Sequence, residues 1–143
     1  MTPENPAAVV LAGGLGTRMR SNTPKHFHPL LGRRMVDWVV EAARAVGADP
    51  LVVVTSSGGA SSFDGVSIAI QREPLGTGDA LTTARDALDG VGGDLLVLSG
   101  DAPRLSPQLL HDLLDAHRRE GAAATILSFR PEDPREYLSL IHI

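Results

Sequence analysis

Short apolar runs alternate along this chain with stretches in which apolar residues recur every three or four positions. Continuous apolar runs are typical of strands in parallel sheets, and the three-to-four spacing is typical of amphipathic helices. The helical spacing occurs in residues 35–46 and 109–114. The apolar runs are residues 7–12, 51–55, 66–70, 95–98 and 122–129. The alternation predicts an α/β protein, and 143 residues predict one compact domain.

Local signals at the ends of the predicted helices support this pattern. Gly47 ends the first helix, and Thr77 is placed to cap a helix that runs through Leu88. Ser106, followed by a proline, has the pattern of a helix N-cap. Residues 56–64 are rich in Ser and Gly, so we expect a surface loop there.

Composition and charge exclude several classes of function. With a net charge of −4, three Phe, one Tyr and one Trp, the chain lacks the basic field and the stacking platforms of nucleic-acid-binding proteins. Without cysteine, it has no disulfide and no thiolate metal site. No apolar run approaches the roughly 20 residues that span a bilayer, and the N-terminus lacks signal-peptide features. We therefore expect a cytoplasmic protein that binds neither nucleic acid nor membrane.

A glycine-rich turn, Gly13-Gly14-Leu15-Gly16-Thr17, follows the first predicted strand. Its glycines let backbone N–H groups approach a phosphate or nucleotide without obstruction by a Cβ. The turn lacks the Gly-Lys-Ser or Gly-Lys-Thr ending of a Walker loop and the third glycine of a dinucleotide fingerprint. Taken alone, it fits an ordinary strand-to-loop turn as well as a nucleotide cradle.

Two cations favour the nucleotide cradle. Arg18 follows the turn and Lys25 follows Pro24, so both side chains can converge on phosphates held by the glycines. A core-packing role explains neither cation, although each alone would be an ordinary solvated charge.

Four segments in order, LAGGLGTRM at 11–19, PK at 24–25, HPL at 28–30 and GRRM at 32–35, carry a resemblance to a known family. They resemble the signature of nucleoside-triphosphate sugar-1-phosphate transferases. Within that superfamily the pattern is similar to the N-terminal N-acetylglucosamine-1-phosphate uridylyltransferase domain of the bifunctional bacterial enzyme, which is also an acetyltransferase. The resemblance implies a Rossmann-like fold, with an open, mostly parallel sheet and helices on both faces.

The resemblance also implies an activity. UMP would pass from UTP to N-acetylglucosamine 1-phosphate by in-line attack, giving UDP-N-acetylglucosamine and pyrophosphate. Arg18 and Lys25 would be the catalytic residues, because they would neutralise charge on the phosphates. Residues in and before the glycine turn would bind the nucleotide, namely Leu11, Ala12, Gly13, Gly14, Gly16 and Thr17.

A second motif, QREPLGTG at residues 71–78, lies between a predicted strand and a predicted helix. On its own, its glycine pair fits a helix cap at least as well as a ligand site. The resemblance assigns recognition of the base to Gln71, Gly76 and Thr77. The family continues with His-Ala, whereas Asp79 stands here in place of the histidine, so the nucleotide preference stays open.

A third motif, SGDAP, begins with Ser99, Gly100 and Asp101 at the carboxyl end of a predicted strand. Open α/β sheets bind ligands at such strand ends. Mg²⁺ prefers one or two carboxylates together with substrate phosphates and water. We therefore expect Asp101 to bind Mg²⁺ and Ser99 and Gly100 to lie beside the nucleotide. Alternatively, Asp101 begins a turn or caps the helix at Ser106.

The resemblance covers residues 7–137 but only about half of the family's catalytic domain. Its later sugar-binding segment, an asparagine metal ligand and the acetyltransferase part are missing. We expect residues 1–137 to form the nucleotide-binding part of a domain that is incomplete at its C-terminus, with weak nucleotide binding and little or no turnover alone. Residues 138–143 back-translate to a sequence that resembles a transposon-based sequencing adapter, so we expect a non-native tail.

Two alternatives stay open. One is another nucleotidyltransferase, such as a guanylyltransferase acting on molybdenum cofactor or mannose 1-phosphate. The other is a non-catalytic nucleotide-binding module, against which the joint retention of Arg18, Lys25 and Asp101 argues. The sequence leaves the sugar and the oligomeric state open, a homo-oligomeric full-length protein included. His26 and His28 are expected on a polar loop, as surface or half-buried residues without a metal role.

Overall fold

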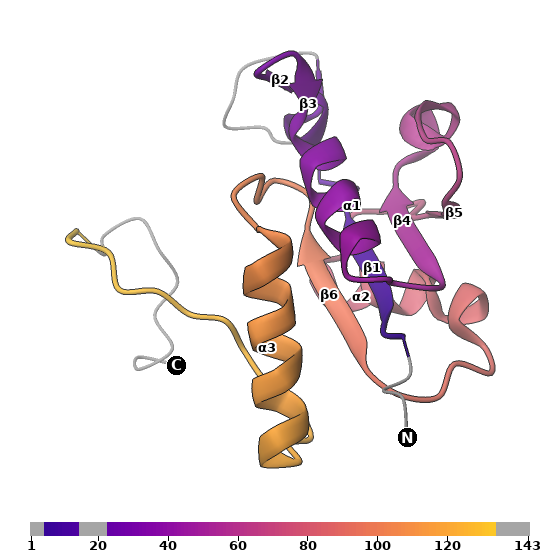
Figure 1. Cartoon of the computed structure of the whole chain (residues 1–143). Coiled ribbons are helices and arrows are strands. Elements are labelled where there is room, and N and C mark those ends of the chain that lie inside the picture. The colour runs from indigo at the N-terminus through magenta and orange to yellow at the C-terminus, as the bar shows by residue number, and fades with distance from the viewer. Residues whose placement is uncertain (1–4, 15–22, 134–143) are drawn as a thin grey trace.

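The computed structural model describes residues 5–14 and 23–133, apart from the side chains of residues 60–62. In these ranges the chain forms a four-stranded sheet in the order β5-β4-β1-β6, in which every pairing is parallel (Figure 1). The strands are β1 (Ala7–Leu11), β4 (Leu51–Thr55), β5 (Ser67–Ile70) and β6 (Leu95–Ser99). The predicted α/β fold with a mostly parallel sheet is confirmed.

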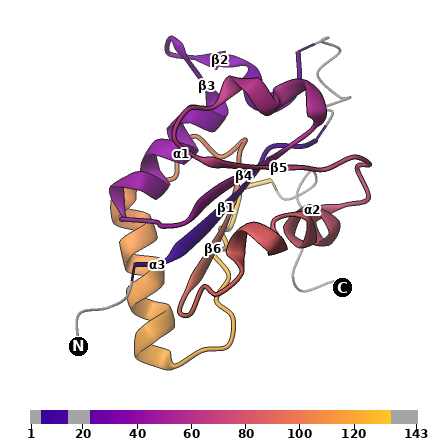
Figure 2. The same cartoon turned by 90° about the vertical axis from the view of Figure 1, so that its right-hand side faces the viewer.

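Helices cover both faces of the sheet. The helices α1 (Met35–Ala45) and α3 (Pro107–Glu120) lie on one face, and α2 (Thr77–Thr83) lies on the other, followed by the 3-10 helix η4 (Arg85–Leu88) (Figure 2). Alternate residues of the strands point to opposite faces, so the core has two parts. The first contains Ala8, Val10, Leu51 and Val53, packed with α1 and α3, and the second contains Val9, Val52 and Val54, packed with α2.

The strand order creates a crevice at the carboxyl ends of the strands. From β1 the chain passes through α1 to β4 on one side, whereas from β5 it passes through α2 to β6 on the other side. The direction in which strands are added to the sheet therefore reverses between the neighbouring strands β1 and β6. In open α/β sheets, such a switch point at the carboxyl ends of the strands is where ligands bind.

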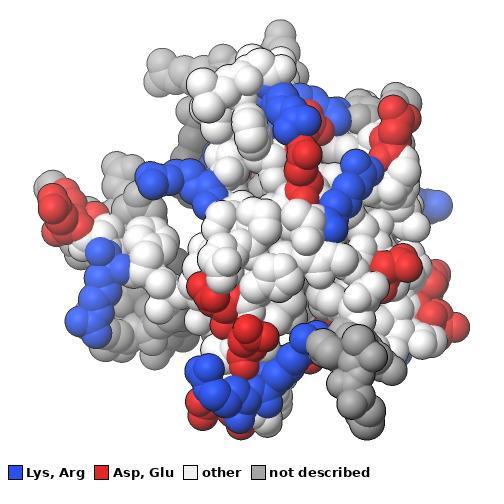
Figure 3. Space-filling view, in the orientation of Figure 1, with Lys and Arg blue, Asp and Glu red and all other residues white. Residues whose placement is uncertain are grey.

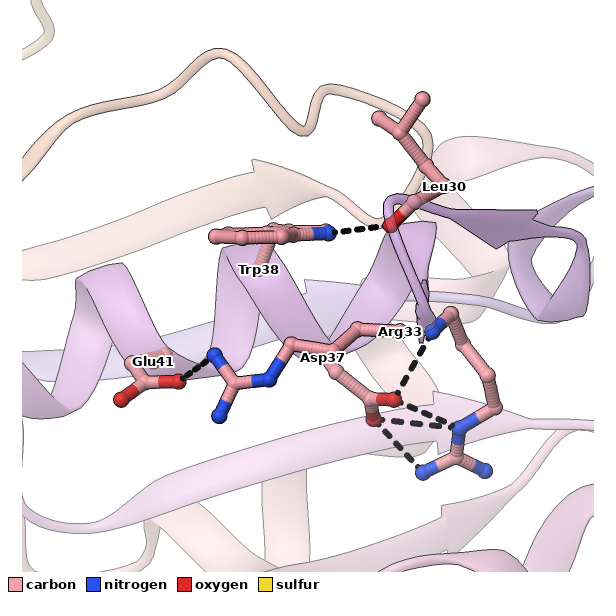
Figure 4. Close-up of polar contacts among 6 residues, drawn as sticks. Leu30, Arg33, Asp37, Trp38 and Glu41 are labelled. Atoms are coloured by element: carbon pink, nitrogen blue, oxygen red, sulfur yellow. Dashed lines mark hydrogen bonds and ion pairs between the residues drawn. The ribbon is translucent and has the colours of Figure 1, made fainter.

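A small hairpin is attached to the start of α1. It consists of β2 (Pro29–Leu30) and β3 (Arg33–Arg34), and the 3-10 helix η2 (Lys25–Phe27) precedes it. The indole Nε1 of Trp38 donates a hydrogen bond to the Leu30 carbonyl at 3.1 Å, and Arg33 pairs with Glu41 (Figure 4). The Arg34 guanidinium binds both carboxylate oxygens of Asp37. These contacts fix the hairpin on α1 and so position η2, which carries two residues of the crevice.

The predicted helix ends are confirmed for α1 and α3. Gly47 adopts a φ of 75° after α1, and its N–H donates to the Arg44 carbonyl. The Ser106 hydroxyl accepts a hydrogen bond from the N–H of Leu109 at 3.2 Å, and a proline begins α3. The prediction that Thr77 caps a helix through Leu88 is wrong in two respects. Gly76 is the N-cap without a side-chain bond, and the helix ends at Thr83, before η4.

Two predicted segments differ from the structure. Residues 56–64, expected as a surface loop, contain the 3-10 helix η3 (Ser57–Ser62), which begins with a hydrogen bond from the Gly59 N–H to the Ser56 carbonyl. Residues 122–129, expected as a strand, are irregular, with 72% of Ile126 and 68% of Phe129 exposed. A strand needs a hydrogen-bonded neighbour, and no described strand lies beside this run. The predicted tail, residues 138–143, lies outside the described residues.

Charged side chains of both signs are interspersed on the face that carries α1 and α3, and no continuous positive patch forms there (Figure 3). Within the described ranges, no helix has the length and apolarity needed to cross a membrane.

Candidate functional site

A cavity of about 550 Å³ opens beside the carboxyl ends of β1 and β6. It extends over the face of the sheet on which α2 lies, and residues from the three predicted motifs line it. These lining residues are Leu11, Gly13, Gly14, Gln71, Gly76, Thr77 and Ser99. The structure therefore brings together motifs that are far apart in the sequence.

Other predicted site residues lie around this cavity or beyond the described ranges. Ala12 is buried, 2% exposed, and Gly100 lies against the end of β1. Gly16, Thr17 and Arg18 lie outside the described residues.

Gly13 and Gln71 lie next to each other in the wall of the cavity. A Cβ added to Gly13 would lie 2.8 Å from Gln71 Oε1, which is too short for a real contact. Only glycine therefore leaves room for the Gln71 amide at this position.

The Gln71 amide is held from behind by α2 and the residue before it. Its Nε2 donates to Asp79 Oδ2 at 2.8 Å and to the Gly76 carbonyl at 3.4 Å. Gln71 is only 8% exposed. In the sequence, Asp79 is recognisable only as a departure from the family pattern. Its contact with Gln71 becomes visible only in the structure, where the chain enters α2 beside Gln71.

Gly100 lets the ends of β1 and β6 approach each other closely. Its N–H donates to the Leu11 carbonyl at 2.9 Å. A Cβ on Gly100 would lie 2.9 Å from that carbonyl oxygen and 3.1 Å from His26 Cδ2. A side chain would therefore push β1, β6 and η2 apart.

Asp101 is held by two neighbours at the rim of the crevice. Lys25 Nζ lies 2.6 Å from Asp101 Oδ2, and the Ser99 hydroxyl donates to Asp101 Oδ1 at 2.5 Å. Partial burial raises the pKa of the Asp101 carboxyl. The hydrogen bonds from Lys25 and Ser99 and the positive charge of Lys25 outweigh burial, so the pKa lies below its ordinary value. Asp101 is thus an ionised carboxylate at neutral pH.

His26 is buried, which contradicts the expectation of a surface or half-buried residue. It is 8% exposed, lines the cavity, and has a buried Nδ1 that makes no hydrogen bond to any described residue. Desolvation by burial lowers the pKa of His26, and the Lys25 charge adds to this, while Asp101 opposes it. The imidazole is therefore neutral at pH 7.

The residues present fit a divalent metal that is shared with a ligand. Among the residues that the structure describes, no group of three or more His, Asp and Glu side chains could hold a metal ion by itself. Asp101 supplies one ionised carboxylate next to the Ser99 hydroxyl. Mg²⁺ is commonly held in this way, by one or two carboxylates with phosphate oxygens and water completing the shell.

A parallel sheet in this strand order, with a glycine-lined cavity at the switch point, is typical of α/β domains that bind nucleotides. The sequence profile of the MobA-like NTP transferase domain matches residues 8–142. The chain belongs to this family, and the predicted nucleotidyltransferase domain is confirmed.

Similar proteins agree with this assignment. The bifunctional protein GlmU of Pelobacter propionicus is 46% identical over 140 residues, which are 94% of this chain and 30% of that protein. This chain thus spans about a third of the length of this curated relative. The resemblance to the N-terminal domain of the bifunctional bacterial enzyme, which the motifs indicated, is confirmed.

Two solved structures share the fold. A nucleotidyl transferase from Methanothermobacter superposes with a TM-score of 0.60 at 28% identity, covering 76% of this chain and 56% of that one. A Mycobacterium tuberculosis protein crystallised with manganese gives a TM-score of 0.66 at 20% identity, covering 81% of this chain and 61% of that one. At 20% identity, the second comparison bears on the fold alone.

Proposed function

We propose that this chain is the nucleotide-binding part of a sugar nucleotidyltransferase that transfers UMP from UTP to N-acetylglucosamine 1-phosphate. The observation that carries the proposal is the meeting of Gly13, Gln71 and Ser99, from three separate motifs, around one cavity, with Lys25 and Asp101 at its rim. The similarity to bifunctional GlmU supports the choice of substrates.

The proposed reaction is a displacement at phosphorus. A phosphate oxygen of the sugar 1-phosphate attacks the α-phosphorus of UTP, and the bond from this phosphorus to the bridging oxygen of the β-phosphate breaks. Pyrophosphate leaves with that oxygen, and UDP-N-acetylglucosamine results. No covalent enzyme intermediate forms, so the protein contributes position and charge.

Each group at the cavity has a role in this proposal. Gly13 and Gly14 leave space for the nucleotide, and Gly16 and Thr17 extend the same motif. Lys25 and Arg18 neutralise negative charge on the phosphates. Leu11 and Ser99 line the cavity at the ends of β1 and β6, and Ala12 and Gly100 adjoin them in the sequence. Gln71, Gly76 and Thr77 take the base.

The metal role falls to Asp101. This carboxylate would hold Mg²⁺, which when bound supplies further neutralisation of phosphate charge. Asp101 is ionised, and Ser99 orients it through the 2.5 Å hydrogen bond.

The proposal includes residues 1–137 as the nucleotide-binding part of a nucleotidyltransferase domain, residues 138–143 as a non-native tail, and a cytoplasmic location. It also includes weak nucleotide binding and little or no turnover by this chain alone, since the chain spans only 30% of the relative's length.

Chemical-shift mapping of the isotope-labelled chain with UTP and Mg²⁺ tests the proposed function. We expect saturable shifts of Gly13, Gly14, Gln71 and Ser99. Lys25→Met should weaken the UTP interaction, whereas Arg119→Met should not, because Arg119 is 70% exposed and pairs with Glu120 at the far end of α3. Shifts confined to another surface, or no saturable shift up to millimolar UTP, would show that the cavity does not take this nucleotide.

A further inference from the structure

The Gln71 amide has one defined orientation. Its Nε2 faces the Asp79 carboxylate at 2.8 Å and the Gly76 carbonyl at 3.4 Å. An ionised carboxylate and a backbone carbonyl are acceptors only, so the NH₂ end of the amide must face them. The assignment of oxygen and nitrogen in this side chain therefore follows from the chemistry of its neighbours.

The carbonyl end of the same amide faces the other way. Gln71 Oε1 lies where a Gly13 side chain would be, 2.8 Å from the Cβ position, and both residues line the cavity. No described residue donates a hydrogen bond to Oε1, although Gln71 is 8% exposed. Gln71 lines the cavity, so a ligand that brings an N–H can donate a hydrogen bond to this free acceptor.

We infer that Asp79 is a specificity-determining residue: by fixing the Gln71 amide, it presents Oε1 to the cavity as an acceptor and selects a nucleobase with a ring N–H. The inference rests on the proposed function, in which this cavity binds a nucleoside triphosphate. A glutamine without a fixed partner can rotate its amide and offer either an acceptor or a donor. Asp79, and not Gln71 alone, therefore sets the preference.

The four common bases divide clearly by this criterion. Uracil carries N3–H and guanine carries N1–H on the edge that pairs with another base. Cytosine N3 and adenine N1 are acceptors at the same position, so each would place a lone pair against Oε1. A site built to accept a hydrogen bond from a substrate N–H rejects an analogue that lacks it, because both groups are left unpaired.

Calorimetric titration of the chain with UTP, CTP, GTP and ATP, each with Mg²⁺, tests this inference. We expect UTP to bind at least about tenfold more tightly than CTP, the ratio that corresponds to one good hydrogen bond. If GTP instead binds more tightly than ATP by a similar ratio, and UTP and CTP bind equally, the site takes guanine. That result would still support Gln71 Oε1 as the acceptor of a hydrogen bond from the base. Equal binding within both pairs would overturn the inference.

Asp79→Asn is the informative variant, because an asparagine side chain can accept from or donate to Gln71 and so lets the glutamine amide turn. We expect the preference of this variant for UTP over CTP to fall to about threefold or less. A ratio of that size corresponds to less than the free energy of one good hydrogen bond. Glu73→Gln is the matched control. It removes the same charge from the segment that precedes α2, its side chain does not hold the Gln71 amide, and it should keep the full preference. An unchanged ratio in Asp79→Asn would overturn the role of Asp79.

Two further outcomes complete the design. If Asp79→Asn unfolds, titration of the unmodified chain with UTP methylated at N3 replaces it: the affinity should fall at least as far as for CTP, and an unchanged affinity would overturn the inference. Binding of none of the triphosphates would instead overturn the proposed function and the inference with it. UTP binding without base preference overturns only the inference.

Discussion

Lys25 Nζ lies 2.6 Å from Asp101 Oδ2, so the cation proposed for the phosphates is paired with the carboxylate proposed for the metal. The Ser99 hydroxyl donates a hydrogen bond to the other carboxylate oxygen of Asp101. With both oxygens taken, a divalent cation must compete with Lys25, whereas a nucleotide that draws Lys25 to its phosphates frees the carboxylate. Metal and nucleotide binding should therefore favour each other, and such coupling acts equally in both directions.

Lys25→Met should accordingly bind Mn²⁺ several-fold more tightly than the unmodified chain when no nucleotide is present. Titration of free Mn²⁺ by electron paramagnetic resonance measures this affinity. Arg119→Met removes one positive charge far from the crevice and should leave it unchanged. An unaltered affinity in Lys25→Met would mean that the ion pair does not compete with the metal.

The buried His26 should make the folded chain sensitive to mild acid. Burial is the main cause that lowers the His26 pKa below 6.5, its ordinary value. The unfolded state therefore binds a proton first, and the free energy of unfolding falls as the pH drops below 6.5 towards the folded-state pKa. Urea unfolding at about pH 7.5 and about pH 5.5 should show this loss, and His26→Gln should reduce it. Equal pH dependence in both proteins would contradict a buried, neutral imidazole.

Gly100→Ala should destabilise the fold by about 1–3 kcal/mol, the usual cost of overpacking. Its Cβ would meet the Leu11 carbonyl oxygen at 2.9 Å, and this backbone atom cannot move without disturbing β1. Gly92→Ala is the matched control, since a Cβ there has no neighbour within 4 Å and Gly92 does not adopt a positive φ. Denaturant unfolding compares the two variants, and similar losses in both would remove the close-approach argument.

Leu31→Asn should stabilise the chain by about 1 kcal/mol, because Leu31 adopts a φ of 52° in the turn between β2 and β3, where a Cβ is disfavoured. Asparagine tolerates this backbone conformation, and Leu31 is 87% exposed, so little packing is lost. Gly32→Ala, at a φ of 81°, should do the opposite. A lower midpoint of urea unfolding for Leu31→Asn would show that the leucine contributes contacts that outweigh its backbone strain.

The alternation of apolar runs and helical spacing predicted much of this fold because those patterns are local. The run at 51–55 is β4 as expected, and Ser106 caps α3 as expected. The strand predicted at 122–129 failed because the formation of a strand depends on a neighbour, which no local pattern contains. The 3-10 helix η3 was also not predicted, because its formation depends on the short connection from β4 to β5.

The candidate site was predictable to the extent that motifs mark it. The glycines, Gln71 and Asp101 were found from short segments, and the crevice unites those that the structure describes. The burial of His26 and the contact of Asp79 with Gln71 depend on how η2 and α2 pack against the sheet. The sequence marked Asp79 only as a departure from the family pattern and His26 only as a loop residue, so only the folded arrangement reveals what each touches.

The outer border of β6 pairs with no other strand in the described part of the chain. Main-chain donors and acceptors along an unprotected border of this kind are free to pair with any extended polypeptide, another molecule of the same chain included. Handling the isolated chain at high concentration therefore carries a risk of precipitation, which an added segment that continues the sheet should reduce.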